Sequence, residues 1–445
     1  MNVLIIDATG CGLSFAMRCQ AYGHKVRLFE RNNKDGSRSE IGDGIIQRIP
    51  EWESSMKWAD LIFCTDNVFY IYQLERYRDQ GYPIVGPSID TNRWEQERDH
   101  GEKILNMAGI ETIPSQTFEN YDEAIKHVLQ NPNRKFVSKP IGDGAKDLSY
   151  VAKSGKEMVY MLQKWKKSNA YKGKFIIQDF RPGIEFAVGG WFGPAGFNKY
   201  WTESWEHKKL YPSELGVATG EQGTIVRKTK TSKLADQMLK PLEDYLHALG
   251  YTGYIDVNCI IDKRGNPNPL EFTMRPGWPL FNIEQSLNKG DPAQWIRDLI
   301  DGKDSLICSD NIACGVVITL PPYPFTGKSK KDNSGFPLWG ITEDDAVRNI
   351  HFCDVKMGKG PELVGDTIKE VPMYVTSGEY VCTVVGLGRT IQDSMDDCYE
   401  RIENKIYIPN SIQYRDDIGE KVQKKLGELQ SYGYAMGVET GKDED

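Results

Sequence analysis

Four side chains around one predicted hairpin have the chemistry of a metal and phosphate site. The run 251–277 predicts two strands joined by a tight turn. Glu271 and Thr273 stand two apart on the second strand and share one face, which Asn258 on the first strand can also face. One carboxylate with neutral oxygens suits Mg²⁺ when phosphates complete the shell, and Arg275 would add a fixed cation beside them. A structural hairpin with a solvated acidic face is the alternative.

A second segment has the features of a polyphosphate-binding turn. Lys139 ends a predicted strand directly before a glycine-containing turn. An ammonium group and free backbone N–H groups would therefore lie together, which is an arrangement that binds phosphates. A surface hairpin is the alternative interpretation. The residues of the turn that we assign to nucleotide binding are Gly142, Gly144 and Lys146.

A third segment can contact a nucleoside. Gln178, Asp179 and Phe180 leave a predicted strand, and Glu185 follows the next Pro-Gly turn. Backbone groups of such a turn can bind the edge of an adenine, and a carboxylate can bind ribose hydroxyls. A purely structural turn explains the same residues.

The turn after the first predicted strand matches a dinucleotide-binding pattern only in part. Gly10 and Gly12 lie in this turn, and Glu30 ends the next strand. The third glycine is missing, and Phe15 stands where close packing of helix on strand favours Gly or Ala. We therefore favour a tight structural turn or an anion-binding helix N-terminus. A nicotinamide-dependent oxidoreductase is an alternative that depends on this turn alone.

These residues lie on predicted alternating strands and helices, which indicate an α/β fold. A chain of 445 residues is too long for one core of ordinary size, so three domains are expected. Alternating strands and helices open the chain as a Rossmann-like parallel unit, which Gly86-Pro87 ends. A single helix from about Thr91 to Met107 is expected next, with Ser88 or Asp90 as its N-cap. The predicted boundaries are 1–88 for the N-terminal domain, 89–311 for a central domain with a lid at about 112–186, 312–430 for a C-terminal α+β domain and 431–445 for a tail.

Charge and composition exclude several classes of protein. A formal charge of −8 argues against a broad nucleic-acid surface. No stretch approaches the roughly 20 apolar residues of a membrane helix, and the chain opens directly on a strand without a signal peptide, so a cytoplasmic location is expected. The nine cysteines form no Cys-x-x-Cys pair and are expected to be reduced core thiols. Residues 439–445 are short, polar and acidic, and are expected to be disordered.

Taken in order, segments from nearly the whole chain resemble the phosphoribosylamine–glycine ligases, the glycinamide ribonucleotide synthetases of purine biosynthesis. The matching segments are Gly86-Pro87-Ser88 with Trp94–Arg98, Lys139 with 142–146, Gln178–Phe180 with Gly183 and Glu185, Glu206-His207-Lys208, Thr219–Gly223, Thr252-Gly253 through Glu271-Phe272, and Cys382–Thr390.

The resemblance implies an ATP-grasp fold and an ADP-forming ligase that uses ATP with Mg²⁺, or Mn²⁺ as an alternative. ATP would activate a small carboxylate, glycine being one candidate, as an acyl phosphate that an amine then attacks. Arg98 and Lys139 would stand at the two ATP lysines. The adenine hinge and ribose carboxylate would be the residues of the third segment. Glu206 and His207 would position the acceptor, with a solvated strand-end histidine as the alternative for His207.

Departures from the family pattern concentrate on its amine-substrate side. The N-terminal loops at 8–14 and 65–70 differ, as does the segment 275–280. Thr273 replaces the metal-binding Asn, which leaves Asn258 as a compensating ligand. We therefore predict an amine other than phosphoribosylamine. An ATP-grasp module that binds nucleotide without catalysis is the alternative from another class, because the metal ligand set is reduced.

Overall fold

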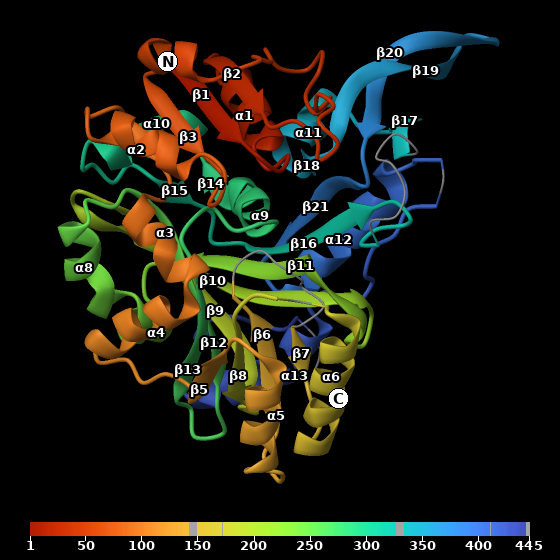
Figure 1. Ribbon diagram of the computed structural model, residues 1–445. Coiled ribbons are helices and arrows are strands. Elements are labelled where there is room, and N and C mark those ends of the chain that lie inside the picture. The colour runs from red at the N-terminus through yellow and green to blue at the C-terminus, as the bar shows by residue number, and fades with distance from the viewer. Residues whose placement is uncertain (142–148, 171, 326–332, 410, 442–445) are drawn as a thin grey trace.

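The N-terminal region is a parallel sheet with helices against it (Figure 1). The computed structural model describes residues 1–141, 149–170, 172–325, 333–409 and 411–441. The strand order in this sheet is β2-β1-β3-β4, with every neighbour parallel, which confirms the predicted Rossmann-like unit. Its elements are β1 (Asn2–Asp7), α1 (Leu13–Ala21), β2 (Lys25–Glu30), β3 (Leu61–Cys64), α2 (Ile71–Arg78) and β4 (Ile84–Val85).

The lid is a small antiparallel sheet with two helices on one face. Its strand order is β5-β8-β6-β7. Phe118, Phe136 and Trp165 belong to a hydrophobic cluster of its own, so the lid has a core separate from that of the remaining protein. The elements are β5 (Ser115–Phe118), α5 (Tyr121–Leu129), β6 (Phe136–Pro140), β7 (Tyr150–Val151), α6 (Gly155–Ser168) and β8 (Phe175–Asp179).

The largest element of the fold is an antiparallel sheet that joins the central and C-terminal regions. Its order is β13-β12-β9-β10-β11-β16-β21-β18, and the pairing of β11 with β16 crosses the boundary that we predicted at residue 312. The strands are β9 (Ile184–Gly193), β10 (Gly196–Tyr211), β11 (Leu215–Thr229), β12 (Gly253–Ile261), β13 (Pro267–Thr273), β16 (Ile312–Thr319), β18 (Ile350–Phe352) and β21 (Tyr380–Gly388).

Helices connect this sheet to the N-terminal region and to the lid. Phe281 of α9 lies 5.4 Å from Phe63 and 5.6 Å from Phe15 between ring centroids, so α9 packs between the two sheets (Figure 1). The helices around the large sheet are α3 (Ile89–Gln96), α4 (Arg98–Met107), α7 (Lys233–Met238), α8 (Glu243–Ala248), α9 (Leu280–Leu287), α10 (Pro292–Ile300), α11 (Glu343–Arg348), α12 (Ile391–Lys405) and α13 (Glu420–Ser431).

The single helix expected from Thr91 to Met107 is two helices. Ser88 is the N-cap of α3, as predicted, and forms a capping box with Thr91. Glu97 leaves the helical region at φ −108° and ψ 87°, and α4 then begins at Arg98. The break turns Arg98 toward the large sheet.

The C-terminal region carries an arm and a tail that packs. The hairpin of β19 (Val355–Val364) and β20 (Thr367–Ser377) projects from the body, with β17 (Ser334–Pro337) at its base (Figure 1). Two further short strands are β14 (Asn288–Lys289) and β15 (Ile307–Cys308).

The tail prediction is wrong for its first residues. The carbonyls of Glu439 and Thr440 accept hydrogen bonds from the N–H groups of Ile391 and Gln392, at the N-terminus of α12. That helix end has N–H groups without intrahelical partners, so the tail supplies acceptors that they need.

The structure also addresses the expectations of reduced core cysteines and of no membrane helix. All nine cysteines are free, and all except Cys11 are buried, as expected for core thiols. Among the helices of the described residues, none is long and apolar enough to cross a membrane.

Candidate functional site

Alternation along four neighbouring strands gathers polar side chains on one face of the large sheet. Asn258 on β12 lies opposite Glu271 on β13, as predicted. Its Nδ2 donates to Glu185 Oε1 at 3.1 Å and to Glu206 Oε2 at 3.0 Å. Side chains from β9, β10, β12 and β13 therefore meet, although the chain separates them widely.

Lys208 lies at the centre of this group, and we did not assign it a role from the sequence. Its Nζ lies 2.9 Å from Glu206 Oε2, 3.2 Å from Glu185 Oε1 and 3.6 Å from Glu271 Oε1. Burial alone would lower the pKa of Lys208, but these carboxylates outweigh it and raise that pKa. Lys208 therefore stays charged. The signal in the sequence was its spacing, because a residue two after Glu206 on a strand shares its face.

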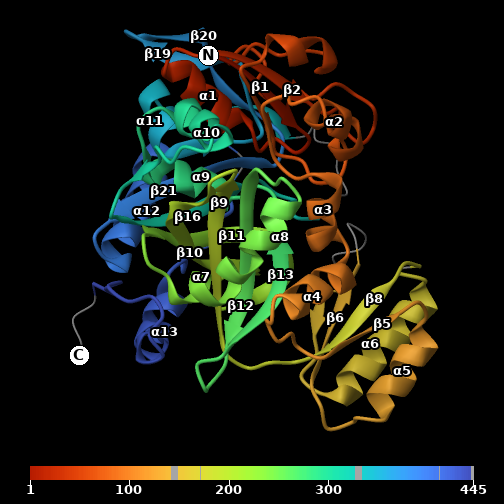
Figure 2. The same cartoon turned by 90° about the vertical axis from the view of Figure 1, so that its left-hand side faces the viewer.

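Two further cations reach the same face from outside the sheet. Arg98, the first residue of α4, donates from Nη2 to Glu271 Oε2 at 2.7 Å. Lys139 comes from β6 of the lid, and burial, with Arg98 next in size, lowers its pKa to about 8. In Figure 2, α4 lies beside the end of the lid that carries β6. Arg98 and Lys139, predicted at the ATP phosphates, thus lie together with the predicted metal ligand Glu271.

Glu271 is an ionised carboxylate suited to a divalent cation. Burial would raise its pKa, but Arg98, Lys208 and Lys139 outweigh burial and hold the pKa of Glu271 well below its usual range. The Oδ1 atom of Asn258 is buried and lacks a hydrogen-bond partner within the described part of the chain. These two oxygens fit Mg²⁺ when phosphates supply the other ligands.

The remaining predicted ligand and an unpredicted carboxylate lie beside them. Thr273 is paired with Asp256 in the β12–β13 register, and its side chain acts to lower the pKa of Asp256. Burial, followed by the charge of Glu206, raises the pKa of Asp256 well above its usual range. In the described ranges no three His, Cys, Asp or Glu side chains are placed to hold a metal ion.

Arg275 is held at the edge of the same face. Its Nη2 lies 3.3 Å from Glu95 Oε1 on α3, and Glu95 also accepts from Met274 N at 2.8 Å and from Asn67 Nδ2 at 2.8 Å. Glu95 thus ties Arg275 to α3 and to the loop after β3. This loop is one of the two that differ from the family pattern.

His207 lies apart from Glu206, contrary to the prediction that both position one acceptor. On strand β10 the two side chains point to opposite faces, and Nε2 of His207 faces the N–H of Gly419 at 3.4 Å. Burial, with Arg415 next in size, lowers its pKa to about 4. The alternative of a solvated histidine is also wrong, because only 1% of the residue is exposed.

The predicted adenine hinge joins two strands of the lid. Asp179 N donates to Pro114 O at 3.0 Å, and Phe180 N donates to Lys135 O at 2.9 Å. Gln178 is buried, and Asp179 pairs with Arg134 at 3.3 Å. A base at this hinge would therefore use groups other than these two N–H groups. Gly142, Gly144 and Lys146 lie outside the described residues.

The first βα turn is closed by its own carboxylate. Asp7 accepts hydrogen bonds from Thr9 N at 3.1 Å, from Thr65 Oγ1 at 2.7 Å and from Gly12 N. Gly10 has φ +80°, which a tight turn requires and glycine adopts readily. A carboxylate already occupies the N-terminus of α1, so the structural turn fits and an anion or pyrophosphate site does not.

Comparison with known proteins finds phosphoribosylamine–glycine ligases among the relatives of this chain. No protein-family model matches the chain. The phosphoribosylamine–glycine ligase of Neisseria meningitidis serogroup A is 27% identical over 78% of this chain and 81% of its own length. That of Leptospira interrogans serovar copenhageni is 24% identical over 76% and 77%.

Solved structures agree on the fold. Phosphoribosylamine–glycine ligase from Thermotoga maritima aligns with a TM-score of 0.70 at 18% identity, over 94% of this chain and 100% of that one. Biotin carboxylase from Campylobacter jejuni, solved with an ATP analogue, aligns with a TM-score of 0.60 at 12% identity over 97% of each chain. The chain therefore has the ATP-grasp fold, and it is similar in sequence to phosphoribosylamine–glycine ligases over more than three quarters of its length.

Proposed function

We propose that this protein is an ADP-forming ligase that joins a small carboxylate to an amine other than phosphoribosylamine. The observation that carries the proposal is the meeting of Arg98, Lys139 and Lys208 around the ionised carboxylate of Glu271, between the lid and the large sheet. Three cations and one ionised carboxylate suit a nucleoside triphosphate bound with a divalent cation.

The residues have separate tasks in this reaction. Arg98 and Lys139 neutralise the phosphates, and Glu271 with Asn258 Oδ1 offers oxygens to Mg²⁺. Arg275, held by Glu95, stabilises negative charge that develops at the reacting centre. Bound ATP supplies the phosphoryl group that activates the carboxylate.

The bonds change in two steps. A carboxylate oxygen of the substrate bonds to the γ-phosphorus, and the bond from that phosphorus to ADP breaks. The amine nitrogen then bonds to the acyl carbon, inorganic phosphate leaves and the nitrogen loses a proton. Glycine is one candidate for the carboxylate.

Nucleotide binding requires an exchange of partners. The ion pair between Arg98 and Glu271, at 2.7 Å, uses the carboxylate oxygen that a metal would bind. We infer that Arg98 turns from Glu271 to a phosphate oxygen when ATP and Mg²⁺ enter. Both charges stay paired in this exchange, so its cost is small.

A coupled assay of ADP release tests the proposal. Wild-type protein is supplied with ATP, Mg²⁺ and pairs drawn from a panel of small carboxylates and amines, and Lys139→Met serves as the inactive control. ADP release that needs both partners of a pair supports the ligase.

The second candidate is a module that binds ATP without catalysis. The resting ion pair of Arg98 with Glu271 favours it, because this pair blocks the metal ligand. ATP binding by calorimetry without ADP release from any pair would favour the module over the ligase.

A further inference from the structure

Glu221 is a buried residue of Thr219–Gly223, a segment that resembles the family pattern, and the proposed mechanism does not use this residue. Only 6% of the residue is exposed, and its Oε1 lacks a hydrogen-bond partner among the residues that the structure describes. Burial, followed by the charge of Glu206, raises the pKa of Glu221 well above its usual range. An unpaired buried carboxylate is costly, so it calls for a ligand or a functional reason.

An irregularity between two strands gives Glu221 its position. His207 is paired with Gly223, but Lys209 is already paired with Ala218, so residues 219–222 of β11 lie against a single residue of β10. Bulges of this kind redirect side chains and are common next to active sites. Besides burial, Glu206 raises the pKa of Glu221 and Lys208 acts to lower it, so the Glu221 side chain lies near the proposed phosphate site.

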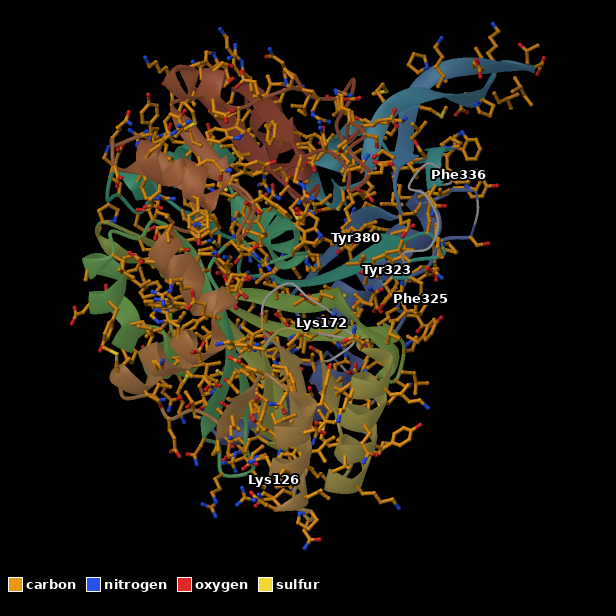
Figure 3. The ribbon with its side chains drawn as sticks, in the orientation of Figure 1. Lys126, Lys172, Tyr323, Phe325, Phe336 and Tyr380 are labelled. Carbon is orange, nitrogen blue, oxygen red and sulfur yellow. The ribbon has the colours of Figure 1, made fainter. Side chains whose placement is uncertain are left out.

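Two tyrosine side chains lie near the segment that carries Glu221. Burial raises the pKa of Tyr323, and the side chains of Thr219 and Gln222, which flank Glu221 in the sequence, act to lower it, so Tyr323 lies near this segment of β11. Its ring contacts the ring of Tyr380 edge to face, with the centroids 5.8 Å apart. Figure 3 labels both tyrosines, which lie close together in that view.

Tyr380 presents a second polar atom without a partner. Its Oη is buried and has no hydrogen-bond partner within the described residues. Trp278 packs against its ring with centroids 6.1 Å apart. Burial raises the pKa of Tyr380, and Tyr323 and Glu221 both raise it further. The unpartnered oxygens of Glu221 and Tyr380 therefore lie in the same part of the protein.

We propose that Glu221 and Tyr380 bind the ammonium group of the amine substrate, while Trp278 and Tyr323 hold an apolar body beside it. The substrate class is thus a primary amine on an apolar or aromatic body without a phosphate. An ammonium group has three donors, which suit the carboxylate oxygen and the phenol oxygen together. Aromatic rings attract the same cation, and a bound cation favours the charged form of Glu221, which would repel a phosphate. Before the ligase step the ammonium group gives one proton to solvent, which frees the nitrogen lone pair for attack on the acyl carbon. The inference rests on the proposed ligase for its reaction, but not for its binding step.

Calorimetry with 2-phenylethylamine tests the binding step without turnover, on full-length protein with ADP and Mg²⁺. Glu221→Gln is expected to weaken binding at least about tenfold, and Tyr380→Phe several-fold, since a hydrogen bond to a charged group is lost. Circular dichroism verifies that both variants fold. Glu362→Gln and Tyr407→Phe, on the arm and on an exposed surface, are matched controls that should bind as the wild type does.

Binding of an uncharged analogue, and binding by the Glu221→Gln variant, decide whether the ammonium group is recognised. The uncharged analogue 2-phenylethanol should bind at least about tenfold more weakly than the amine, since it lacks the ammonium group. An affinity for 2-phenylethylamine that is undetectable, or that Glu221→Gln leaves unchanged, overturns the proposal.

Turnover separates this proposal from that of the ligase. Amine binding that depends on Glu221, without ADP release from any substrate pair, would remove the ligase and keep the amine site. ADP release with a phosphorylated amine that is insensitive to Glu221→Gln would keep the ligase and remove the amine site.

Discussion

The lowered pKa of Lys139 makes ATP affinity depend on pH above neutrality. Burial and the neighbouring Arg98 lower this pKa to about 8 in the free protein, whereas phosphates in contact with Lys139 favour its charged form. Binding then takes up a proton, so affinity falls as pH rises through 8. With a pKa of 8, about nine-tenths of Lys139 is charged at pH 7 and about one-tenth at pH 9, so the affinity should fall roughly tenfold.

Calorimetry of ATP with Mg²⁺ at pH 7, 8 and 9 measures this fall. Lys139→Met should weaken binding at pH 7 by about 1.5–3 kcal/mol, the worth of a charge-assisted hydrogen bond, and should abolish the pH dependence. Lys139→Arg should retain the charge at pH 9 and flatten the profile. Lys126→Met, on the exposed surface of lid helix α5 (Figure 3), is the control and should behave as the wild type. A wild-type affinity that is constant from pH 7 to 9, or an equal slope in Lys139→Met, would refute the assignment of Lys139 to a phosphate.

Three further changes test the same site. Glu271→Gln should abolish Mg²⁺-dependent ADP release and change the unfolding free energy of the ligand-free protein by no more than about 1 kcal/mol, because its ion pairs are partly exposed; a large loss of stability in denaturant would mark Glu271 as structural. Lys208→Met should lower the unfolding free energy by roughly 2–4 kcal/mol, because carboxylates lose their shared cation. The loss should be greater at pH 8 than at pH 5.5, since Glu206, whose pKa burial raises, holds a proton in the folded variant that the unfolded chain has released; an equal loss at both pH values would argue against this charge cluster. Phosphoribosylamine supplied with glycine, ATP and Mg²⁺ should yield its amide at a kcat/KM well below about 10⁴ M⁻¹s⁻¹, and efficient formation would restore the ordinary family activity.

Period-two spacing was sufficient to predict one face of the metal hairpin. Asn258 does lie opposite Glu271, as alternation along two paired strands requires. The same rule applied to β12 and β10 would have added Asp256 and Lys208, which share faces with Asn258 and Glu206. The same rule places His207 and Glu206 on opposite faces of β10. The prediction that both position one acceptor followed the family resemblance and did not apply the alternation of side chains along a strand.

Other features depend on contacts that spacing does not encode. The predicted helix breaks at Glu97 because α4 packs against both β13 and α3. The packing against α3 is so close that a side chain at position 101 would clash with Trp94 O, and this position is Gly101. The order of the tail at Glu439 and Thr440 comes from the N-terminus of α12. Both are tertiary effects that override local preference.

The charges of the site explain how it tolerates the change at Arg98, where the family resemblance implies a lysine. A guanidinium carries several donors in a fixed plane, and Arg98 here contacts Leu270 O at 3.5 Å as well as Glu271 Oε2 at 2.7 Å. In the ligand-free protein the cations and carboxylates neutralise each other across β9, β10 and β13. In the proposed bound state phosphates would attract Arg98 and Lys139, and a metal ion would attract Glu271, so the same charges would have different partners. Lys208 pairs with Glu185 and Glu206 without these ligands, so its removal should affect the fold as well as nucleotide binding.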